Sequence, residues 1–191
     1  MKIVGINASP REESNTRIAI QAALEEAERK GADVQIFDTN KMKITPCQGD
    51  NTCKANGGKC VIDDEMQDIY DAINEADGVI LATPIYWYGP AAQLKVVIDR
   101  MYSYYMTPAA DQLKGKKISI ITSQGAPGEE AFADTRTIIL KGFEALGFEI
   151  VADEGFTENN QPAAIANKDD DIKRAVALGD KMVEWIYKYS I

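Results

Sequence analysis

Short apolar runs alternate with longer amphipathic stretches along the chain, and this alternation limits the possible folds more than any other feature. Runs of strand length occupy residues 3–6, 34–37, 79–82, 117–122 and 148–151. Helices are predicted between and after them, over residues 16–30, 64–75, 91–105, 129–146 and 172–186. Residues 79–82 are apolar on both faces, which is typical of a central parallel strand covered by helices on each side.

This order of strands and helices predicts an α/β fold with a doubly wound, five-stranded parallel sheet. The handedness of crossover connections leaves few topologies, and the flavodoxin-like strand order 2-1-3-4-5 fits the pattern. We find no linker or repeat, so residues 1–191 are expected to form a single domain. Ligands of such sheets bind outside the carboxyl ends of the strands. The loops after the first, third and fourth strands are therefore the expected functional segments.

The chain has no histidine, and its 30 acidic and 21 basic residues give a formal charge of −9. Without histidine, Ser-His and Cys-His nucleophile pairs and His-ligated metal sites are excluded. The acidic balance argues against nucleic acid and membranes as partners, because both attract basic surfaces. No apolar stretch approaches the roughly 18 residues of a membrane span, and we see no signal peptide. We therefore expect a cytoplasmic protein.

The loop after the first predicted strand combines groups that bind anions at the point where a helix begins. Ser14, Asn15 and Thr16 are good N-cap residues, and capping accounts for only one of them. Together with Ser9 and Arg11, they place hydroxyls, an amide and a guanidinium around the positive end of a helix. The loop has neither the glycine pattern of dinucleotide sites nor that of triphosphate loops. It therefore predicts a site for a terminal monophosphate.

The loops after the third and fourth predicted strands are the other two candidate segments, and the first of them suits a planar ring. Pro84 forces an extended entry to the first of these loops, so its main chain can present N–H and C=O groups. Tyr86 and Trp87 offer flat apolar surface, although such residues also suit a plug over the core or an oligomer interface. The segment Ser123-Gln124-Gly125 opens the second loop, where the glycines are equally compatible with a simple turn.

These motifs together resemble the NAD(P)H-dependent FMN reductases, which have the flavodoxin-like fold. The resemblance rests on Ser-Pro-Arg and Ser-Asn-Thr after the first strand, and on Pro-Ile-Tyr-Trp-x-Gly followed by Leu-Lys and Ile-Asp-Arg. It implies that three loops bind FMN. They are expected to contact the phosphate through Ser9, Arg11, Ser14, Asn15 and Thr16, the isoalloxazine through Pro84, Ile85, Tyr86 and Trp87, and its pyrimidine edge through Ser123, Gln124 and Gly125.

The same resemblance implies an oxidoreductase in which FMN accepts hydride from NADH or NADPH and reduces a small acceptor, such as a flavin, a quinone or a nitroaromatic. No catalytic side chain is expected, because the cofactor carries the chemistry. In this family the helix that contains the Leu-Lys and Ile-Asp-Arg motifs helps to form a dimer. A homodimer or homotetramer is therefore expected.

Two other classes of protein fit parts of the sequence. A flavodoxin-like or iron–sulfur flavoprotein electron carrier would take single electrons from a protein partner, which the acidic surface suits, and would not oxidise NAD(P)H. A response-regulator domain shares the strand order but needs an acidic cluster after the first strand and an aspartate at the end of the third. Ser9 and Thr83 stand in those places, so we set this class aside.

Cys47, Cys53 and Cys60 lie close together after the second predicted strand, which suggests a metal or redox role. The segment resembles the iron–sulfur flavoproteins, relatives of the reductases in which four cysteines hold a 4Fe–4S cluster. Asp50 stands here in place of the second cysteine. A cubane cluster normally needs four thiolates, and structural zinc sites favour Cys and His. We predict no metal; an intact cluster and a zinc site that includes Asp50 remain as alternatives.

Overall fold

The structure of the chain, a computed structural model, describes residues 1–189. The strands are β1 (Lys2–Asn7), β2 (Asp33–Asp38), β3 (Gly78–Tyr86), β4 (Gly89–Pro90), β5 (Lys117–Ser123) and β6 (Glu149–Phe156). The α-helices are α1 (Asn15–Arg29), α2 (Thr52–Ala55), α3 (Met66–Glu75), α4 (Ala92–Arg100), α5 (Ala133–Glu144) and α6 (Asp169–Tyr189). Short 3-10 helices connect them: η1 (Thr39–Lys41), η2 (Met101–Ser103), η3 (Pro108–Gln112), η4 (Glu129–Phe132) and η5 (Ala164–Asn167).

The sheet has the order β2-β1-β3-β5-β6, and all neighbouring strands on this path are parallel. β4 lies off the path and forms an antiparallel hairpin with the end of β3. β5 and β6 are therefore the fourth and fifth strands of the expected 2-1-3-4-5 order. The predicted α/β, flavodoxin-like fold is confirmed.

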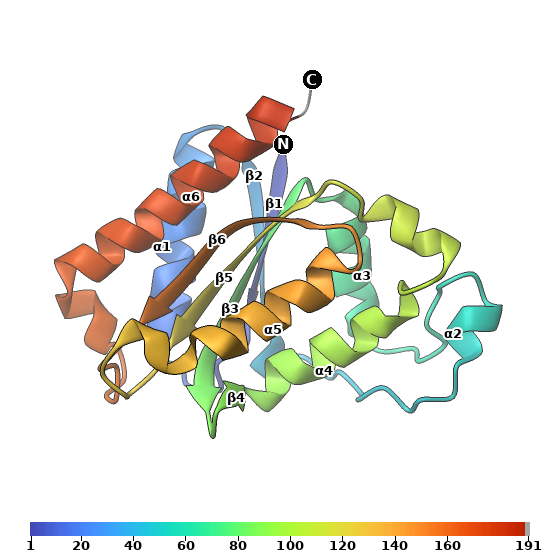
Figure 1. Cartoon of the computed structure of the whole chain (residues 1–191), viewed down its shortest axis with the longest axis horizontal. Helices are drawn as coiled ribbons and strands as arrows, with labels where there is room; N and C mark the ends of the chain where they lie inside the picture. The colour runs from blue at the N-terminus through green and yellow to red at the C-terminus, as the bar shows by residue number, and fades with distance from the viewer. Residues whose placement is uncertain (190–191) are drawn as a thin grey trace.

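Helices cover both faces of the sheet (Figure 1). On one face, α1 and α6 pack together over a buried cluster that includes Ile20 and Met182. On the other face, α3, α4 and α5 cover a second buried cluster, with Ile69, Leu94 and Phe143 as members. Within residues 1–189, no helix is both long enough and apolar enough to span a bilayer.

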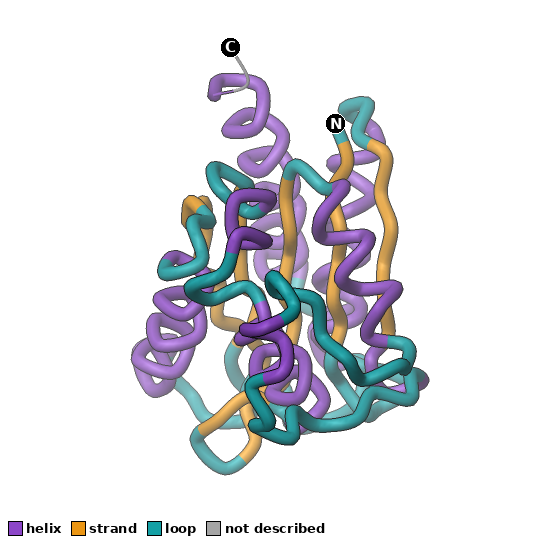
Figure 2. The backbone as a smooth tube through the Cα atoms, turned by 90° about the vertical axis from the view of Figure 1, so that its right-hand side faces the viewer, coloured by secondary structure: helices purple, strands orange, loops and turns teal. Residues whose placement is uncertain are grey.

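The strands end close together at their carboxyl edge. Pro84 of β3 is in register with Ser123 of β5, and Ser123 is in register with Phe156 of β6. On the other side of β3, Asn7 of β1 pairs with Ala82. Figure 2 shows the strands side by side, with the β4 hairpin at one end. The loops that follow these strands therefore meet at the edge where doubly wound sheets bind their ligands.

The third strand is longer than the sequence predicts. We expected the strand over residues 79–82, with Pro84 already in the loop that follows, but β3 continues to Tyr86 and then turns back through β4. The prediction was wrong because β1 pairs with β3 only as far as Ala82. Pro84 lies beyond the part of β3 that pairs with β1, and its carbonyl accepts a hydrogen bond from the Ala91 amide at 3.3 Å. Proline is tolerated there because no β1 carbonyl pairs with the position of its missing N–H.

Two predicted helices are interrupted, and β6, like β3, is longer than expected. Residues 91–105 form α4 and then η2, and the main chain turns at Met106, whose φ is 54°. Residues 129–146 begin with η4 before α5. β6 continues to Phe156, well past its predicted end. As an edge strand, β6 carries exposed polar residues such as Asp153, and the continuous apolar pattern is therefore lost.

The contact between α1 and α6 gives a test of the packing. At Gly179, an added Cβ would lie 2.0 Å from the main-chain oxygen of Ala23. Gly179→Ala must push the helices apart and should lower the free energy of unfolding by about 2 kcal/mol. Gly142→Ala in α5 is the matched control, because its Cβ meets no atom within 4 Å, and it should raise that free energy by about 0.5–1 kcal/mol. Urea denaturation measures both; equal effects would contradict the packing.

Candidate functional site

A polar cavity of about 190 Å³ opens at the carboxyl edge of the sheet. Four segments at this edge contribute to its lining: the connection from β1 into α1, the end of β3, and the loops that follow β5 and β6. The lining residues are Ser9, Arg11, Ser14, Asn15, Thr16, Pro84, Ile85, Tyr86, Ser123, Gln124, Gly125, Asn159 and Asn160. The structure thus brings the residues predicted from three separate loops into one cavity, with Trp87 as the exception.

The start of α1 forms one wall of this cavity. Ser14 is the N-cap of α1, and its Oγ accepts a hydrogen bond from the Arg17 amide at 3.1 Å. The Thr16 hydroxyl donates to Asn7 Oδ1 at 3.0 Å. These two side chains therefore build the helix start. The main-chain N–H groups of the first turn have no carbonyl partner within a helix, and they are suited to bind an anion.

Asn15 connects the helix start to the segment after β6. Its Nδ2 donates to the carbonyl oxygens of Asn159 and Gln161, at 3.2 and 2.9 Å, and its Oδ1 accepts from the Ile165 amide at 3.0 Å. Both polar atoms of this buried side chain have partners within the protein. Asn15 therefore holds two walls of the cavity together.

Ser9 and Arg11 complete the wall that faces the start of α1. Ser9 is buried, and its Oγ accepts a hydrogen bond from the Arg11 amide at 3.3 Å. Arg11 is exposed, and its Nη1 donates to the main-chain carbonyl of Asn160 at 3.1 Å. A neutral carbonyl does not cancel the charge of a guanidinium, so Arg11 retains its positive charge beside the cavity.

The loop after β3 is a tight hairpin with aromatic residues at its tip. Pro84, Ile85 and Tyr86 line the cavity. Trp87 and Tyr88 have φ values of 46° and 66°, which are unusual for bulky residues. The Trp87 side chain is 96% exposed and lies outside the cavity lining. The hairpin therefore presents aromatic surface next to the cavity, and the predicted flavin contact of Trp87 stays a prediction.

The loop after β5 carries a buried amide with a free acceptor. Gln124 Nε2 donates to the carbonyl of Gly128 at 2.9 Å, whereas its Oε1 is buried without a partner. Gly125 follows, and a Cβ there would lie 2.0 Å from Asn160 Oδ1. A side chain at this position would therefore displace the Asn160 amide.

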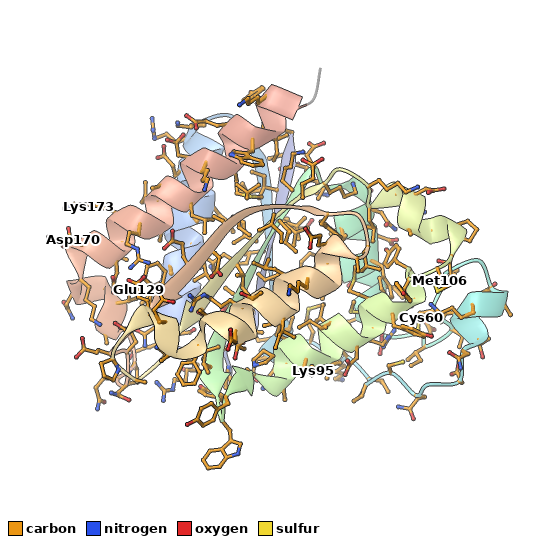
Figure 3. The ribbon with its side chains drawn as sticks, viewed as in Figure 1. Cys60, Lys95, Met106, Glu129, Asp170 and Lys173 are labelled. Carbon is orange, nitrogen blue, oxygen red and sulfur yellow. The ribbon has the colours of Figure 1, made fainter. Side chains whose placement is uncertain are left out.

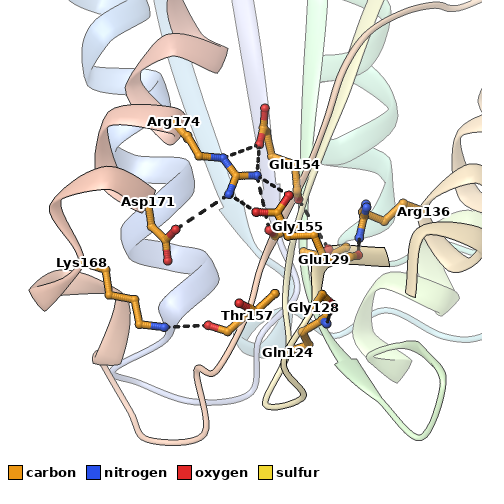
Figure 4. A network of polar contacts seen from close by, with 11 residues as sticks. Gln124, Gly128, Glu129, Arg136, Glu154, Gly155, Thr157, Lys168, Asp171 and Arg174 are labelled. Atoms are coloured by element: carbon orange, nitrogen blue, oxygen red, sulfur yellow. Dashed lines mark hydrogen bonds and ion pairs between the residues drawn. The ribbon is translucent and has the colours of Figure 1, made fainter. Parts of the chain in front are cut away.

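A network of charged residues fixes the far end of the same loop (Figure 4). Arg174 of α6 pairs with Glu154 of β6 at 2.6 Å and donates to Glu129 at 3.1 Å. Arg136 of α5 donates to the main-chain oxygen of Glu129 at 3.3 Å. Glu129 comes directly after the loop, so these bonds attach the loop to α5, α6 and β6.

The fourth wall of the cavity, which follows β6, was not predicted from the sequence. The Asn159 amide donates to the Gln124 carbonyl at 2.9 Å, and Asn160 Nδ2 donates to the Gly125 carbonyl at 3.2 Å. The sequence did contain a signal for this wall, because the adjacent polar residues Asn159 and Asn160 follow the last strand at the ligand-binding edge. It was overlooked because that strand was predicted to end before its polar half.

The cysteine segment lies away from this cavity. Cys47 borders an apolar groove between α4 and α5, whereas Cys60 borders a separate cavity beside Tyr70 of α3. In Figure 3, Cys60 lies well apart from Glu129, which follows the loop after β5. The Asp50 carboxylate accepts hydrogen bonds from the Thr52 amide, at 2.8 Å, and hydroxyl, and these bonds hold the pKa of Asp50 below its usual value.

Arg100 forms hydrogen bonds with both ends of the cysteine segment, residues 45–64. Its Nη1 donates to the Thr45 carbonyl and to Asp64 Oδ2, each at 2.8 Å, and its Nη2 donates to the Ile62 carbonyl at 3.4 Å. The Arg100 side chain is fully buried. The middle of the segment is held by Lys54, whose ammonium lies 3.7 Å from the centre of the Tyr102 ring.

Comparison with known proteins identifies the family. The sequence model of the NADPH-dependent FMN reductase family matches residues 1–156. The chain therefore belongs to the NADPH-dependent FMN reductase family, and its class is that of the oxidoreductases that use FMN.

Curated relatives agree with this assignment. An iron-sulfur flavoprotein of Archaeoglobus fulgidus is 35% identical over 184 residues, which cover 96% of this chain and 80% of the relative. The iron-sulfur flavoprotein MJ1083 of Methanocaldococcus jannaschii is 40% identical over 100 residues, about half of each protein. A putative NAD(P)H-dependent FMN-containing oxidoreductase of Bacillus subtilis, YwqN, is 33% identical over 100 residues, again about half of each.

Solved structures share the fold. An NAD(P)H:quinone oxidoreductase from Methanothermobacter marburgensis superimposes with a TM-score of 0.77 at 20% identity, and the match covers 94% of each chain. A flavodoxin from the domain Archaea has a TM-score of 0.62 at 16% identity, with 98% of this chain and 99% of that chain covered. At these identities the likeness shows the fold alone.

The residues that line the cavity suit FMN in their chemistry. A helix start, a serine hydroxyl and Arg11 surround one part of it, as an anionic phosphate requires. Gln124 Oε1 and the side chain of Asn159 are buried in the protein without partners, although buried polar groups are nearly always hydrogen-bonded. Unpaired groups of this kind in a cavity lining are expected where a polar ligand belongs.

The cysteine segment does not fit an iron–sulfur cluster. Within residues 1–189, no three Cys, His, Asp or Glu side chains come together in a way that would hold a metal ion. Cys47 and Cys60 line different cavities, and Arg100 and Lys54 hold the segment through protein contacts alone. The structure thus differs from what the names of the relatives suggest.

Removal of Arg100 should destabilise the protein. Arg100→Met leaves Asp64 nearly buried and unpaired, since only 9% of its side chain is exposed, and should lower the free energy of unfolding by about 3 kcal/mol. Lys173→Met breaks an exposed pair with Asp170 and should cost less than about 1 kcal/mol. Urea denaturation at neutral pH compares them, and equal losses would contradict the role of Arg100.

The same pair should make stability depend on pH. Burial raises the pKa of Asp64, but hydrogen bonds from Arg100 and from the Thr45 and Met66 amides outweigh burial and hold it below the usual value of 3.8. A carboxyl whose pKa is lowered by folding stabilises the protein above its unfolded pKa and loses that effect as the pH falls through the folded pKa. The difference between wild type and Arg100→Met should therefore shrink below about pH 4. A constant difference down to pH 2 would contradict this.

Protein purified without oxygen should contain no stoichiometric iron. A variant with serine at Cys47, Cys53 and Cys60 should bind FMN as well as the wild type, because none of the three thiols lines the polar cavity at the carboxyl edge of the sheet. Metal analysis and flavin titration measure the two quantities. Stoichiometric iron together with acid-labile sulfide would contradict the assignment.

Proposed function

We propose that this protein oxidises NADPH or NADH through bound FMN and passes the electrons to a small acceptor, such as a flavin, a quinone or a nitroaromatic. When bound, FMN takes hydride from the nicotinamide and releases electrons to the acceptor. The observation that carries the proposal is the polar four-segment cavity that ends beside an exposed aromatic hairpin. The family to which the chain belongs supports the same function.

Different residues of the cavity bind the phosphate and the ring of FMN. The first-turn amides of α1, the Ser9 hydroxyl and the Arg11 guanidinium hold the phosphate. The main chain after β3 and β5 borders the ring, and Gln124 Oε1 is a free acceptor there. Tyr86 is 40% exposed at the edge of the cavity, so it offers one flat surface while the opposite side stays open to the nicotinamide or the acceptor.

We also propose a cytoplasmic homodimer or homotetramer formed from this single domain. An apolar groove of about 560 Å³ lies between α4 and α5, with Ile98, Met101 and Phe143 in its lining. Tyr102 and Tyr105 border it and are more than 40% exposed. Apolar surface of this kind suits an interface between subunits. Analytical ultracentrifugation would test the assembly, and a monomer at micromolar concentration would contradict it.

An electron carrier is the second candidate, and the fold likeness to a flavodoxin and the net charge of −9 favour it. The two candidates differ in their electron donor. Anaerobic mixing with NADPH and a soluble quinone should consume NADPH over many turnovers if the protein is a reductase. A carrier would consume none until a partner reductase is added. Protein stripped of flavin is the control, and it should be inactive until FMN is restored.

Arg11→Ala should weaken FMN binding by about 1.5–3 kcal/mol, the contribution of a hydrogen bond to a charged group. Arg29→Ala is the matched control, because Arg29 lies at the other end of α1 and pairs with Glu26. Titration of the apoprotein by quenching of flavin fluorescence gives both dissociation constants. Equal affinities in the Arg11→Ala variant and the wild type would refute the phosphate assignment.

A further inference from the structure

Asn159 is the residue of the cavity lining whose side-chain amide is buried with neither polar atom hydrogen-bonded. The residue is only 5% exposed, and both Nδ2 and Oδ1 are buried without a hydrogen bond. Asn15, by contrast, has partners for both of its amide atoms. An unpaired buried amide destabilises the protein by itself, so its place in the lining of a cavity points to a ligand.

The main chain holds Asn159 in place. Its N–H donates to the Gln124 carbonyl at 2.9 Å, and its carbonyl accepts from Asn15 Nδ2 at 3.2 Å. Asn15 begins α1 at the phosphate end of the cavity, whereas Gln124 follows β5 at the end that borders the ring. Asn159 therefore lies between the two ends of the ligand.

The free groups of Asn159 match one part of FMN best. A phosphate at neutral pH only accepts hydrogen bonds and would leave Oδ1 unpaired. A hydroxyl both donates and accepts, so it satisfies both atoms of an amide. The part of FMN between its phosphate and its ring is a chain of hydroxyl-bearing carbons.

We infer that Asn159 binds the ribityl hydroxyls of FMN and thereby makes the site specific for flavins that carry this chain. The inference rests on the proposed FMN site and adds a binding group from a fourth loop. Gln124 Oε1, which can only accept, is left for an N–H of the ring. Each unpaired atom of the cavity then has a counterpart of its own along the cofactor.

Three flavins separate the possible roles of Asn159. FMN carries ring, ribityl chain and phosphate; riboflavin lacks the phosphate; lumiflavin lacks the chain as well. Asn159→Ala should weaken FMN and riboflavin about tenfold each, the size of one or two neutral hydrogen bonds. It should leave lumiflavin within about twofold. Fluorescence titration of the apoprotein measures all three dissociation constants, and no turnover is needed.

Two further variants calibrate the result. Arg11→Ala should weaken FMN alone, because riboflavin and lumiflavin have no phosphate. Asn167→Ala removes an exposed asparagine from the same connection between β6 and α6, and it should change none of the three affinities. If Asn159→Ala does not fold, Asn159→Asp keeps the shape and the acceptor but loses the donor. It should weaken riboflavin binding, by about threefold for one lost hydrogen bond.

Every other pattern of affinities contradicts a contact between Asn159 and the ribityl chain. Equal losses for all three flavins would place Asn159 at the ring, a loss for FMN alone would place it at the phosphate, and no loss would exclude contact; any of these overturns the inference. An unchanged affinity for riboflavin in a folded Asn159→Asp variant would overturn it too. If the wild-type protein binds no flavin at all, the proposed function fails, which is a different result.

Discussion

The register of the parallel strands places every part of the candidate site. Pro84, Ser123 and Phe156 are level with one another across β3, β5 and β6, so the end of β3 and the loops after β5 and β6 meet at one edge of the sheet. The loop after β1 joins them from the next strand, where Asn7 pairs with Ala82. A slip of one residue would turn every side chain of a strand to the other face of the sheet. The apolar cover on both faces, from α1 and α6 and from α3, α4 and α5, holds this register.

Bonds between the loops then convert their convergence into a defined cavity. Asn15 reaches from α1 to the segment after β6, and Asn160 reaches from that segment to Gly125. In these contacts, polar groups of the cavity lining form hydrogen bonds with one another. What remains is a charged guanidinium, a free acceptor on Gln124 and a free amide on Asn159. This remainder is the basis on which we assign the phosphate, the ring edge and the polyol chain.

The sequence allowed the sheet order and three of the cavity loops to be predicted, because strand-length apolar runs and helix N-caps depend on local chemistry. It did not reveal that Ser14 and Thr16 would bond within the helix start, since cap and ligand roles require the same residue types. Pro84 was misread as a strand end, because its neighbours in the sheet are not visible in a linear pattern. Asn159 was missed for a related reason, as the polar half of an edge strand looks like a loop.

The cysteine segment shows how a relative's name can differ from the chemistry of a chain. Arg100 and Lys54 attach this segment to α4 and to the residues that follow it, and the thiols are not gathered. Both candidate functions, the reductase and the electron carrier, are argued from the flavin cavity and assign no role to the thiols.

The most direct measurement is the visible spectrum of the anaerobically purified protein before and after one equivalent of NADPH. The account predicts flavin absorption that is lost on addition, with one FMN reduced for each NADPH consumed. Flavin absorption that persists would contradict the reductase and leave the electron carrier. A colourless protein that takes up no added FMN would contradict the flavin site itself.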